Sequence, residues 1–412
     1  MRNVFAALFF FVAQLSIAQP AQTLYFDPAS AIGAPVSRLF ESVTYIPLET
    51  TRQSLFGQIS HLVVTAQYFI VFDYDTQALY FFDKNGKFVK KYKDDKYTIA
   101  ALYWMQKENA LYILQAKSYR LTDQERDELL HTPFTKSTSK YGRAVLYNLN
   151  NIEKEQISEM PDFGIFMANP TLLAPGQWAY SSVISYSDAK DTVDFELKIS
   201  NGQKITKAYF PYTKRRSTFL SDPANIEFFA ASQSNTLLFT RPYYNSVYQL
   251  TPDSVTVLYN FVLPFENTVP KTFFTKEFSS RNELRDYKQN NPAYAWRING
   301  LIPFHNLLFF SLDYQKRDRR FIFDKSTNRF YNVNKISADS TNAYLPVMGW
   351  GIQYYDTTAL YSSISSDAMF RSRDAEKHRN PVYSELLTNY FDKSKSTSNP
   401  VIIILKPVIK NK

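Results

Sequence analysis

The sequence predicts an all-β protein: a six-bladed β-propeller of four-stranded antiparallel blades, closed by its N- and C-terminal strands, with helical insertions on one face. Three observations predict this fold. A unit of four strands separated by polar turns recurs along the chain, aromatic residues make up 17% of the 412 residues, and an apolar strand lies near each end. Radial repetition protects strand edges, and aromatic side chains suit packed sheet faces.

The N-terminus has the pattern of a signal peptide. Arg2 precedes an apolar run from Val4 to Ile17, and Ser16-Ile-Ala18 offers small residues for cleavage. The run is too short to span a membrane. We therefore predict a signal peptide over 1–18 with cleavage near Ala18, a lead-in segment over 19–42, a propeller over 43–412, and a periplasmic or secreted product.

The repeated unit is clearest over 67–92. There, Asn85-Gly86 joins two strands rich in apolar and aromatic residues, which is a strong hairpin signal. Other copies cover 235–261 and 306–333, weaker ones cover 110–158 and 177–211, and a sixth begins over 348–364.

The sixth unit lacks its own outer strand. Val401–Leu405 and Val43–Leu48 can supply the missing pair, with the strand of Pro47 outermost, where proline is tolerated. Pairing these distant segments would close the ring.

Four segments also resemble a known family. They are Tyr45-Ile-Pro-Leu-Glu-Thr-Thr51, Leu55-Phe-Gly57, Phe82-Asp-Lys-Asn-Gly-Lys-Phe88 and Asn399-Pro-Val-Ile-Ile403. They are similar to an exported, NHL-like six-bladed β-propeller family that is common in Bacteroidetes and largely uncharacterised. The resemblance implies a propeller and export, but no catalytic residues. Many members carry a lipid-anchor cysteine, and this chain has none.

Three long excursions interrupt the blades, over 116–142, 264–297 and 365–399. If each blade runs from inner to outer strand, all three connections emerge on one face, the one that usually holds a ligand mouth. They look partly helical, and Thr122-Asp-Gln-Glu125 is a capping-box pattern. Two interpretations stay open: a lid or partner surface, or helices that merely cap the ring.

Composition excludes several functions. Zero cysteine removes disulfides, thiolate metal sites and cysteine nucleophiles, and only 10 glycines make phosphate-binding loops unlikely. The net charge of +9 is spread along the chain, and export argues against nucleic acid as a partner. A basic surface could meet anionic glycans or lipid headgroups, or it could simply be solvated.

Candidate ligand-binding residues gather in the loops between blades. The basic ones are Arg52, Arg215 and Arg297, and the aromatic ones are Trp296, Trp350 and Tyr354. Guanidinium groups pair with carboxylates, and flat rings stack on sugars. Glu227 could hold an arginine side chain in a fixed position. The glycines flanking Trp350 permit close approach of the backbone to a neighbouring group. The alternative is a solvated rim around a structural core.

The sequence holds no recognisable catalytic, metal or cofactor motif. His61 and His305 fall in or near predicted inner strands, but ordinary strand-end histidines explain them better than metal ligands. Asp73-Tyr-Asp75 begins like a calcium loop yet is better read as a turn. We therefore expect a monomeric binding or scaffold protein for an anionic glycan or envelope partner. The alternative is a carbohydrate- or lactone-active lyase or hydrolase.

Overall fold

Six antiparallel sheets form the structure of the protein, a computed structural model. It describes residues 21–117, 122, 124, 142–160, 171–181, 195–201, 204–211, 227–231, 233–349 and 351–408. In the order of their inner strands, we number the sheets as blades 1 to 6.

The strands of each blade are given from the inner to the outer one. Blade 1 has β4 (His61–Val64), β5 (Tyr68–Asp73), β6 (Ala78–Asp83) and β7 (Phe88–Tyr92). Blade 2 has β8 (Tyr97–Met105), β9 (Ala110–Lys117), β10 (Gly142–Asn148) and β11 (Ile157–Glu159). Blade 3 has β12 (Thr171–Ala174), β13 (Gln177–Ser181), β14 (Phe195–Ser200) and β15 (Ile205–Pro211).

The other half of the ring follows the same order. Blade 4 has β16 (Phe228–Ala230), β17 (Leu237–Thr240), β18 (Ser246–Leu250) and β19 (Val255–Val262). Blade 5 has β20 (Arg297–Phe304), β21 (Leu307–Tyr314), β22 (Arg317–Asp324) and β23 (Arg329–Ser337). Blade 6 has β24 (Ile352–Tyr355), β25 (Leu360–Ile364), β26 (Val401–Pro407) and β3 (Phe40–Pro47).

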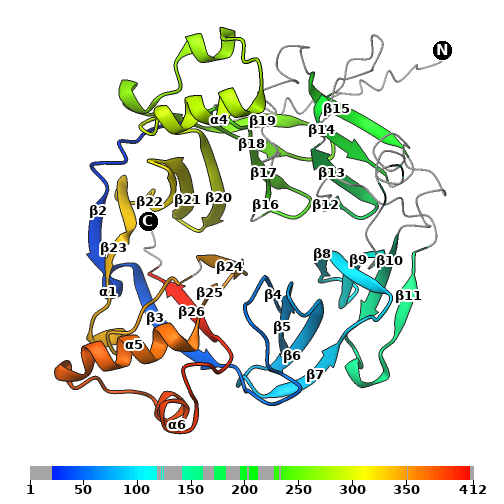
Figure 1. The fold of residues 1–412 in the computed structure, drawn as a ribbon, viewed down its shortest axis with the longest axis vertical. Helices are drawn as coiled ribbons and strands as arrows, with labels where there is room; N and C mark the ends of the chain where they lie inside the picture. The colour runs from blue at the N-terminus through cyan, green and yellow to red at the C-terminus, as the bar shows by residue number, and fades with distance from the viewer. Residues whose placement is uncertain are drawn as a thin grey trace, which may run out of the picture.

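Short helices connect or decorate the blades. They are α1 (Val36–Leu39), η2 (Ile152–Lys154), η3 (Phe265–Asn267), η4 (Lys271–Thr275), α4 (Arg281–Asn290), η5 (Ser340–Asn342), α5 (Ser366–Glu376), η6 (Lys377–Arg379) and α6 (Glu385–Lys393). Figure 1 shows the six blades around one centre, with β4, β8, β12, β16, β20 and β24 nearest to it. The predicted propeller is therefore confirmed.

Apolar side chains on both faces of each blade build the core. Because side chains alternate along a strand, Phe69 and Val71 of β5 face blade 6, while Ile70 and Phe72 face blade 2. Each neighbouring pair of blades shares such a cluster. Between blades 1 and 2, for example, Phe81 stacks on Tyr147 with ring centroids 5.6 Å apart.

The ring closes as the sequence predicts. β26 pairs antiparallel with β3, in a register that runs from Val401 opposite Pro47 to Leu405 opposite Val43. Pro47 ends the outermost strand, where its missing N–H costs no ladder bond.

Asn399, which is fully buried, ties this closure to the loop that enters blade 1. Its side-chain Nδ2 donates to the carbonyls of Glu49 and Ser54, both at 2.8 Å. Its Oδ1 accepts from Phe56 N at 3.2 Å, and its backbone N donates to Thr50 Oγ1 at 2.9 Å. One side-chain amide thus satisfies three backbone groups from a segment about 350 positions away.

The tight turn of blade 1 completes this junction. Gly86 has a φ of +83°, and a Cβ there would lie 2.2 Å from the carbonyl oxygen of Pro47. Glu49 N donates to Gly86 O at 2.8 Å, and Phe88 N donates to Glu49 Oε2 at 2.9 Å. Glycine is required here both for its backbone conformation and for the close contact.

The lead-in segment is part of the ring, which the sequence analysis did not foresee. β1 (Gln22–Tyr25) pairs parallel with β19 as a fifth strand of blade 4, and β2 (Ile32–Pro35) pairs parallel with β23 of blade 5. Phe26, 1% exposed, sits between these blades with ring centroids 4.9 Å from Phe321 and 5.2 Å from Phe310. The segment therefore forms a strap across blades 4 and 5 before it continues into β3 of blade 6.

Asn399→Asp tests the closure. A carboxylate cannot donate, so it would face the Glu49 and Ser54 carbonyls as an uncompensated buried charge, and we expect a loss of about 3–5 kcal/mol in the free energy of unfolding. Denaturant unfolding measures it. Asn334→Asp, at an exposed position of β23, is the control and should stay within about 0.5 kcal/mol of the parent protein. Equal effects in the two variants would contradict the assigned role.

Candidate functional site

The candidate site lies on the face at which the inner strands begin, which we call the top face. Arg297, at the start of β20, is the register partner of Asp313 near the end of β21, so both connections of this blade reach the top face. The same topology places the segments 264–297 and 365–399 there, as expected. Most of the third excursion, 116–142, lies outside the described residues.

The helices of the last excursion cap the rim of the ring. Met369 of α5 and Leu387 and Tyr390 of α6 are buried in one cluster with Leu39 and Tyr45. Figure 1 shows α5 and α6 at the outer edge of the ring rather than over its centre. Of the two interpretations left open, this excursion fits the structural cap.

The excursion over 264–297 contains its own small aromatic core. Trp296, expected at the mouth, is only 4% exposed and packs with ring centroids 5.4 Å from Phe273 and 6.1 Å from Tyr243. The indole cannot stack on a ligand while it holds this cluster together. The expectation for Trp296 therefore does not fit its position, because the insertion folds back over it.

Glu227 and Arg297 do come together, as the sequence suggested that Glu227 could order an arginine. Glu227 directly precedes β16 and Arg297 begins β20, so the pair joins the inner strands of blades 4 and 5. Arg297 Nη2 lies 3.0 Å from Glu227 Oε1. The arginine side chain is 10% exposed and the carboxylate side chain 50% exposed, so the anionic partner is the one that solvent or a ligand can reach.

The remaining predicted residues are dispersed. Arg52 is exposed in the loop after β3, in a turn that Thr51 and Ser54 stabilise. Tyr354 lies toward the far end of β24 and packs edge-on against Tyr361, at a ring distance of 5.7 Å. Burial, and secondly the charge of Asp356, raise the pKa of Tyr354 to about 12. Arg215 and Trp350 lie outside the described residues.

The two glycines that flank position 350 have a packing role. A Cβ on Gly349 would meet the carbonyl oxygen of Ser363 at 2.5 Å, and one on Gly351, at a φ of +92°, would meet Arg320 Nη1 at 3.1 Å. Ser362 Oγ also donates to Gly351 O at 2.6 Å. This segment is thus fixed against β25 and beside an arginine of blade 5.

The two histidines of interest lie at opposite ends of their inner strands. His61 begins β4 at the top face, whereas His305 lies in the turn that follows β20, where its Nε2 donates to Thr357 O at 3.2 Å. A site using both imidazoles is therefore excluded. His61 is solvent-accessible, yet desolvation by the surrounding strands lowers its pKa.

Sequence reasoning missed a buried ion pair between blades 3 and 4. Arg241 Nε and Nη2 each donate to Glu196 at 2.9 Å, and the guanidinium lies 4.1 Å from the Phe210 ring and 4.3 Å from the Tyr244 ring. Burial alone would lower the pKa of Arg241, but the bonds and charge of Glu196 raise it. Glu196 and Lys198 alternate with apolar residues in β14, a pattern that predicts a solvated strand face, so the sequence does not reveal that Glu196 is buried.

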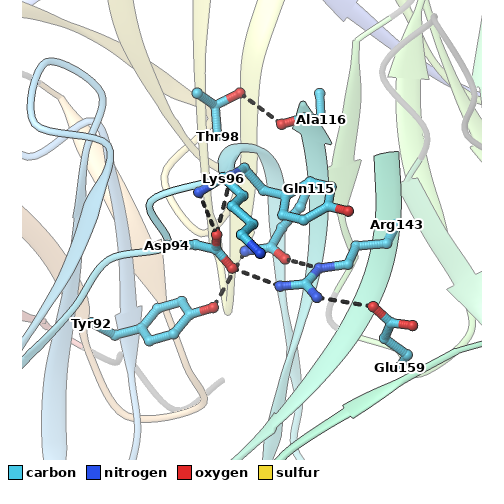
Figure 2. A network of polar contacts seen from close by, with 9 residues as sticks. Tyr92, Asp94, Lys96, Thr98, Gln115, Ala116, Arg143 and Glu159 are labelled. Carbon is cyan, nitrogen blue, oxygen red and sulfur yellow. Dashed lines mark hydrogen bonds and ion pairs between the residues drawn. The ribbon is translucent and has the colours of Figure 1, made fainter. Parts of the chain in front are cut away.

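A second missed network, shown in Figure 2, joins blades 1 and 2. Arg143 Nη2 donates to Asp94 at 2.6 Å, Nη1 to Glu159 at 2.9 Å, and Nε to Gln115 at 2.8 Å. Gln115 in turn donates to the Tyr92 hydroxyl at 3.3 Å. Because every nitrogen of this guanidinium is already bonded, the network holds blades together rather than offering a free anion site.

The acidic residues of the turns serve the backbone, as predicted. Asp73 accepts from Gln58 N at 3.4 Å, Thr76 N at 3.0 Å and Thr76 Oγ1 at 2.6 Å. Asp83 and Asp324 cap their turns in a similar way. Within the described ranges, no cluster of three or more His, Asp or Glu residues is arranged to hold a metal ion.

No helix in the described part of the chain is long and apolar enough to cross a membrane.

Fold and sequence together define the class of protein: a six-bladed β-propeller with terminal-strand closure. The DUF5128 family, described as a 6-bladed β-propeller, matches residues 32–124 and 138–358, and the chain belongs to this family. No curated protein matches the chain.

The chain is also similar to solved structures. A protein of Bacteroides fragilis NCTC 9343 designated as exported is 14% identical, with a TM-score of 0.64 over 94% of this chain and 100% of its own. A DUF4221 family member from Bacteroides vulgatus ATCC 8482 is 12% identical, with a TM-score of 0.41 over 91% and 98%. Streptogramin B lyase is 9% identical, with a TM-score of 0.36 over 90% and 100%.

His61 gives a test of the electrostatics at the top face. Because desolvation by the surrounding strands disfavours the imidazolium, His61 should titrate below the ordinary value of about 6.5, with the unfolded chain taking up the proton first as pH falls. Stability should therefore decline from about pH 7 to pH 5, and His61→Gln should reduce that decline. NMR titration of the imidazole, assigned with this variant, measures the midpoint. A midpoint at or above the ordinary value would contradict the prediction.

Proposed function

We propose that the protein is an exported binding or scaffold propeller that takes an anionic glycan, or an anionic partner of the cell envelope, at the top face near the ring axis. The signal-like segment over 1–18 supports export, with cleavage near Ala18. The exported designation of the related protein from Bacteroides fragilis supports it as well.

The Glu227–Arg297 pair is the observation that carries this proposal. It joins the starts of two neighbouring inner strands, and its cation is mostly enclosed while its carboxylate is half exposed. A carboxylate on a ligand can therefore replace Glu227 as the partner of Arg297. The planar guanidinium group suits bidentate binding of a carboxylate. Binding would cost little new ordering because the arginine is already held in place.

His61 supports a second candidate function. It is an accessible imidazole on an innermost strand, and its lowered pKa keeps it in the neutral, proton-accepting form near neutral pH. A general base of this kind could serve a lyase or hydrolase acting on an anionic carbohydrate or a lactone. This enzyme proposal predicts product formation that His61→Gln abolishes, whereas the binding proposal predicts an unchanged ligand.

Two variants of the ion pair should change affinity in opposite directions. Arg297→Gln removes the cation and should weaken binding of trigalacturonate about tenfold. Glu227→Gln removes the competing carboxylate and should strengthen binding about threefold, in line with the energies of partly exposed charge pairs. Isothermal titration calorimetry measures both.

The design separates binding from folding. Both variants break the same ion pair, so a mere stability effect would move them in the same direction. A neutral trisaccharide serves as the ligand control and should show no dependence on either substitution. Failure of the parent protein to bind trigalacturonate would refute the uronate form of the proposal.

A further inference from the structure

We infer that the hairpin joining β21 and β22 is a second anion subsite, which extends the mouth outward over blade 5 and selects an extended uronate polymer over a short one. This inference rests on the proposed function, because it concerns the length of the same ligand. Its evidence comes from the turn conformation, the contacts that fix the turn, and the charges it presents.

The turn has an unusual residue choice for its conformation. Gln315 and Lys316 have φ values of 54° and 61°, so both central residues of a two-residue hairpin turn are left-handed. Such a turn normally uses Asn-Gly, because other residues pay about 1 kcal/mol or more for this conformation. A lysine kept at the tip despite that strain is a candidate for function.

Several contacts hold the tip in place. Gln315 N donates to Pro292 O at 2.8 Å, which fixes the turn against the segment after α4. Gln315 Nε2 donates to the Tyr314 hydroxyl at 2.9 Å, and Gln315 Oε1 accepts from Arg319 Nη2 at 3.4 Å. The glutamine therefore serves the turn itself, and the following lysine projects from a rigid support.

The cations of this hairpin are available to a partner. Lys316 and Arg317 are both exposed, and neither forms an ion pair with a side chain in the described part of the chain. Arg319 and Arg320 follow on the same strand and are half-buried. Arg320 Nη2 donates to Gly349 O at 3.4 Å, so positive charge continues from the hairpin toward the inner strand of blade 6.

The register links this hairpin to the mouth. Arg297 is the partner of Asp313, and Lys316 follows Asp313 by three residues. The backbone separation along the strand is thus about 10 Å. A ligand that spans both groups must be an extended polyanion, because a single carboxylate held by Arg297 does not reach the hairpin tip.

The experiment compares galacturonic acid, the monomer, with long-chain polygalacturonate on Lys316→Glu, Arg317→Glu and the double variant. We expect the double variant to weaken polymer binding about tenfold or more at low salt and to leave binding of the monomer, which carries a single carboxylate, within about twofold. Arg329→Glu is the matched control, since it reverses an exposed arginine on the same blade at the opposite end of the hairpin strands.

A glycine variant separates strain from charge. Lys316→Gly relieves the left-handed conformation and should raise the unfolding midpoint, yet it should still weaken polymer binding. A turn with only a structural role would gain stability without loss of affinity, which would overturn the inference.

Other outcomes are equally decisive. Unchanged polymer binding in the double variant, with monomer binding still weakened in Arg297→Gln, overturns the subsite while the proposed function stands. No binding of either probe by the parent protein overturns both. Binding of vesicles rich in anionic phospholipid in place of the polymer, with loss in the double variant, would assign the hairpin to a membrane surface and overturn the glycan assignment.

Discussion

A ring of blades has to be joined to itself, and in this chain the joint is made without any covalent link. The joint is the pairing of β3 with β26, and the sequence has no cysteine to reinforce it. Asn399 adds the hydrogen bonds that a strand ladder cannot supply, because it satisfies backbone groups in the loop beyond the ladder. Every other blade contact depends on this joint, since an open ring would leave two sheet faces uncovered.

The segments that resemble a family in the sequence meet physically at that joint. Glu49 contacts both Gly86 and Phe88, while Asn399 bonds to the loop on the other side of Glu49. Four short stretches, which come from both ends of the ring, thus form one junction. This explains the resemblance in structural terms: the similar residues are those that close a six-bladed ring, and they carry no information about a ligand.

The fold was predictable because each blade is built from strands and turns that short-range sequence patterns indicate. The turn at Gly86 and the strand pair containing Pro47 both follow from short-range rules. The parallel strands β1 and β2 were missed because parallel addition to an edge leaves no turn in the sequence.

The site was less predictable than the fold. Glu227 and Arg297 are 70 positions apart but meet through neighbouring inner strands, as suggested. Trp296, beside Arg297 in the sequence, is instead buried in the aromatic cluster of the insertion. Whether Trp296 lies at the mouth or inside the insertion depends on how that insertion folds back.

The strap formed by the first strands has a consequence for the order of folding. Residues 22–47 are synthesised first, but their partners β19, β23 and β26 lie in the second half of the chain. β1 and β2 must stay unpaired until blades 4 and 5 are available, and β3 until almost the whole chain is, which gives the molecule a high contact order and a slow final step. Until then, the apolar strand that contains Tyr45 and Ile46 is an exposed edge open to wrong partners. The last event of folding is therefore the pairing of β3, near the N-terminus, with β26, near the C-terminus.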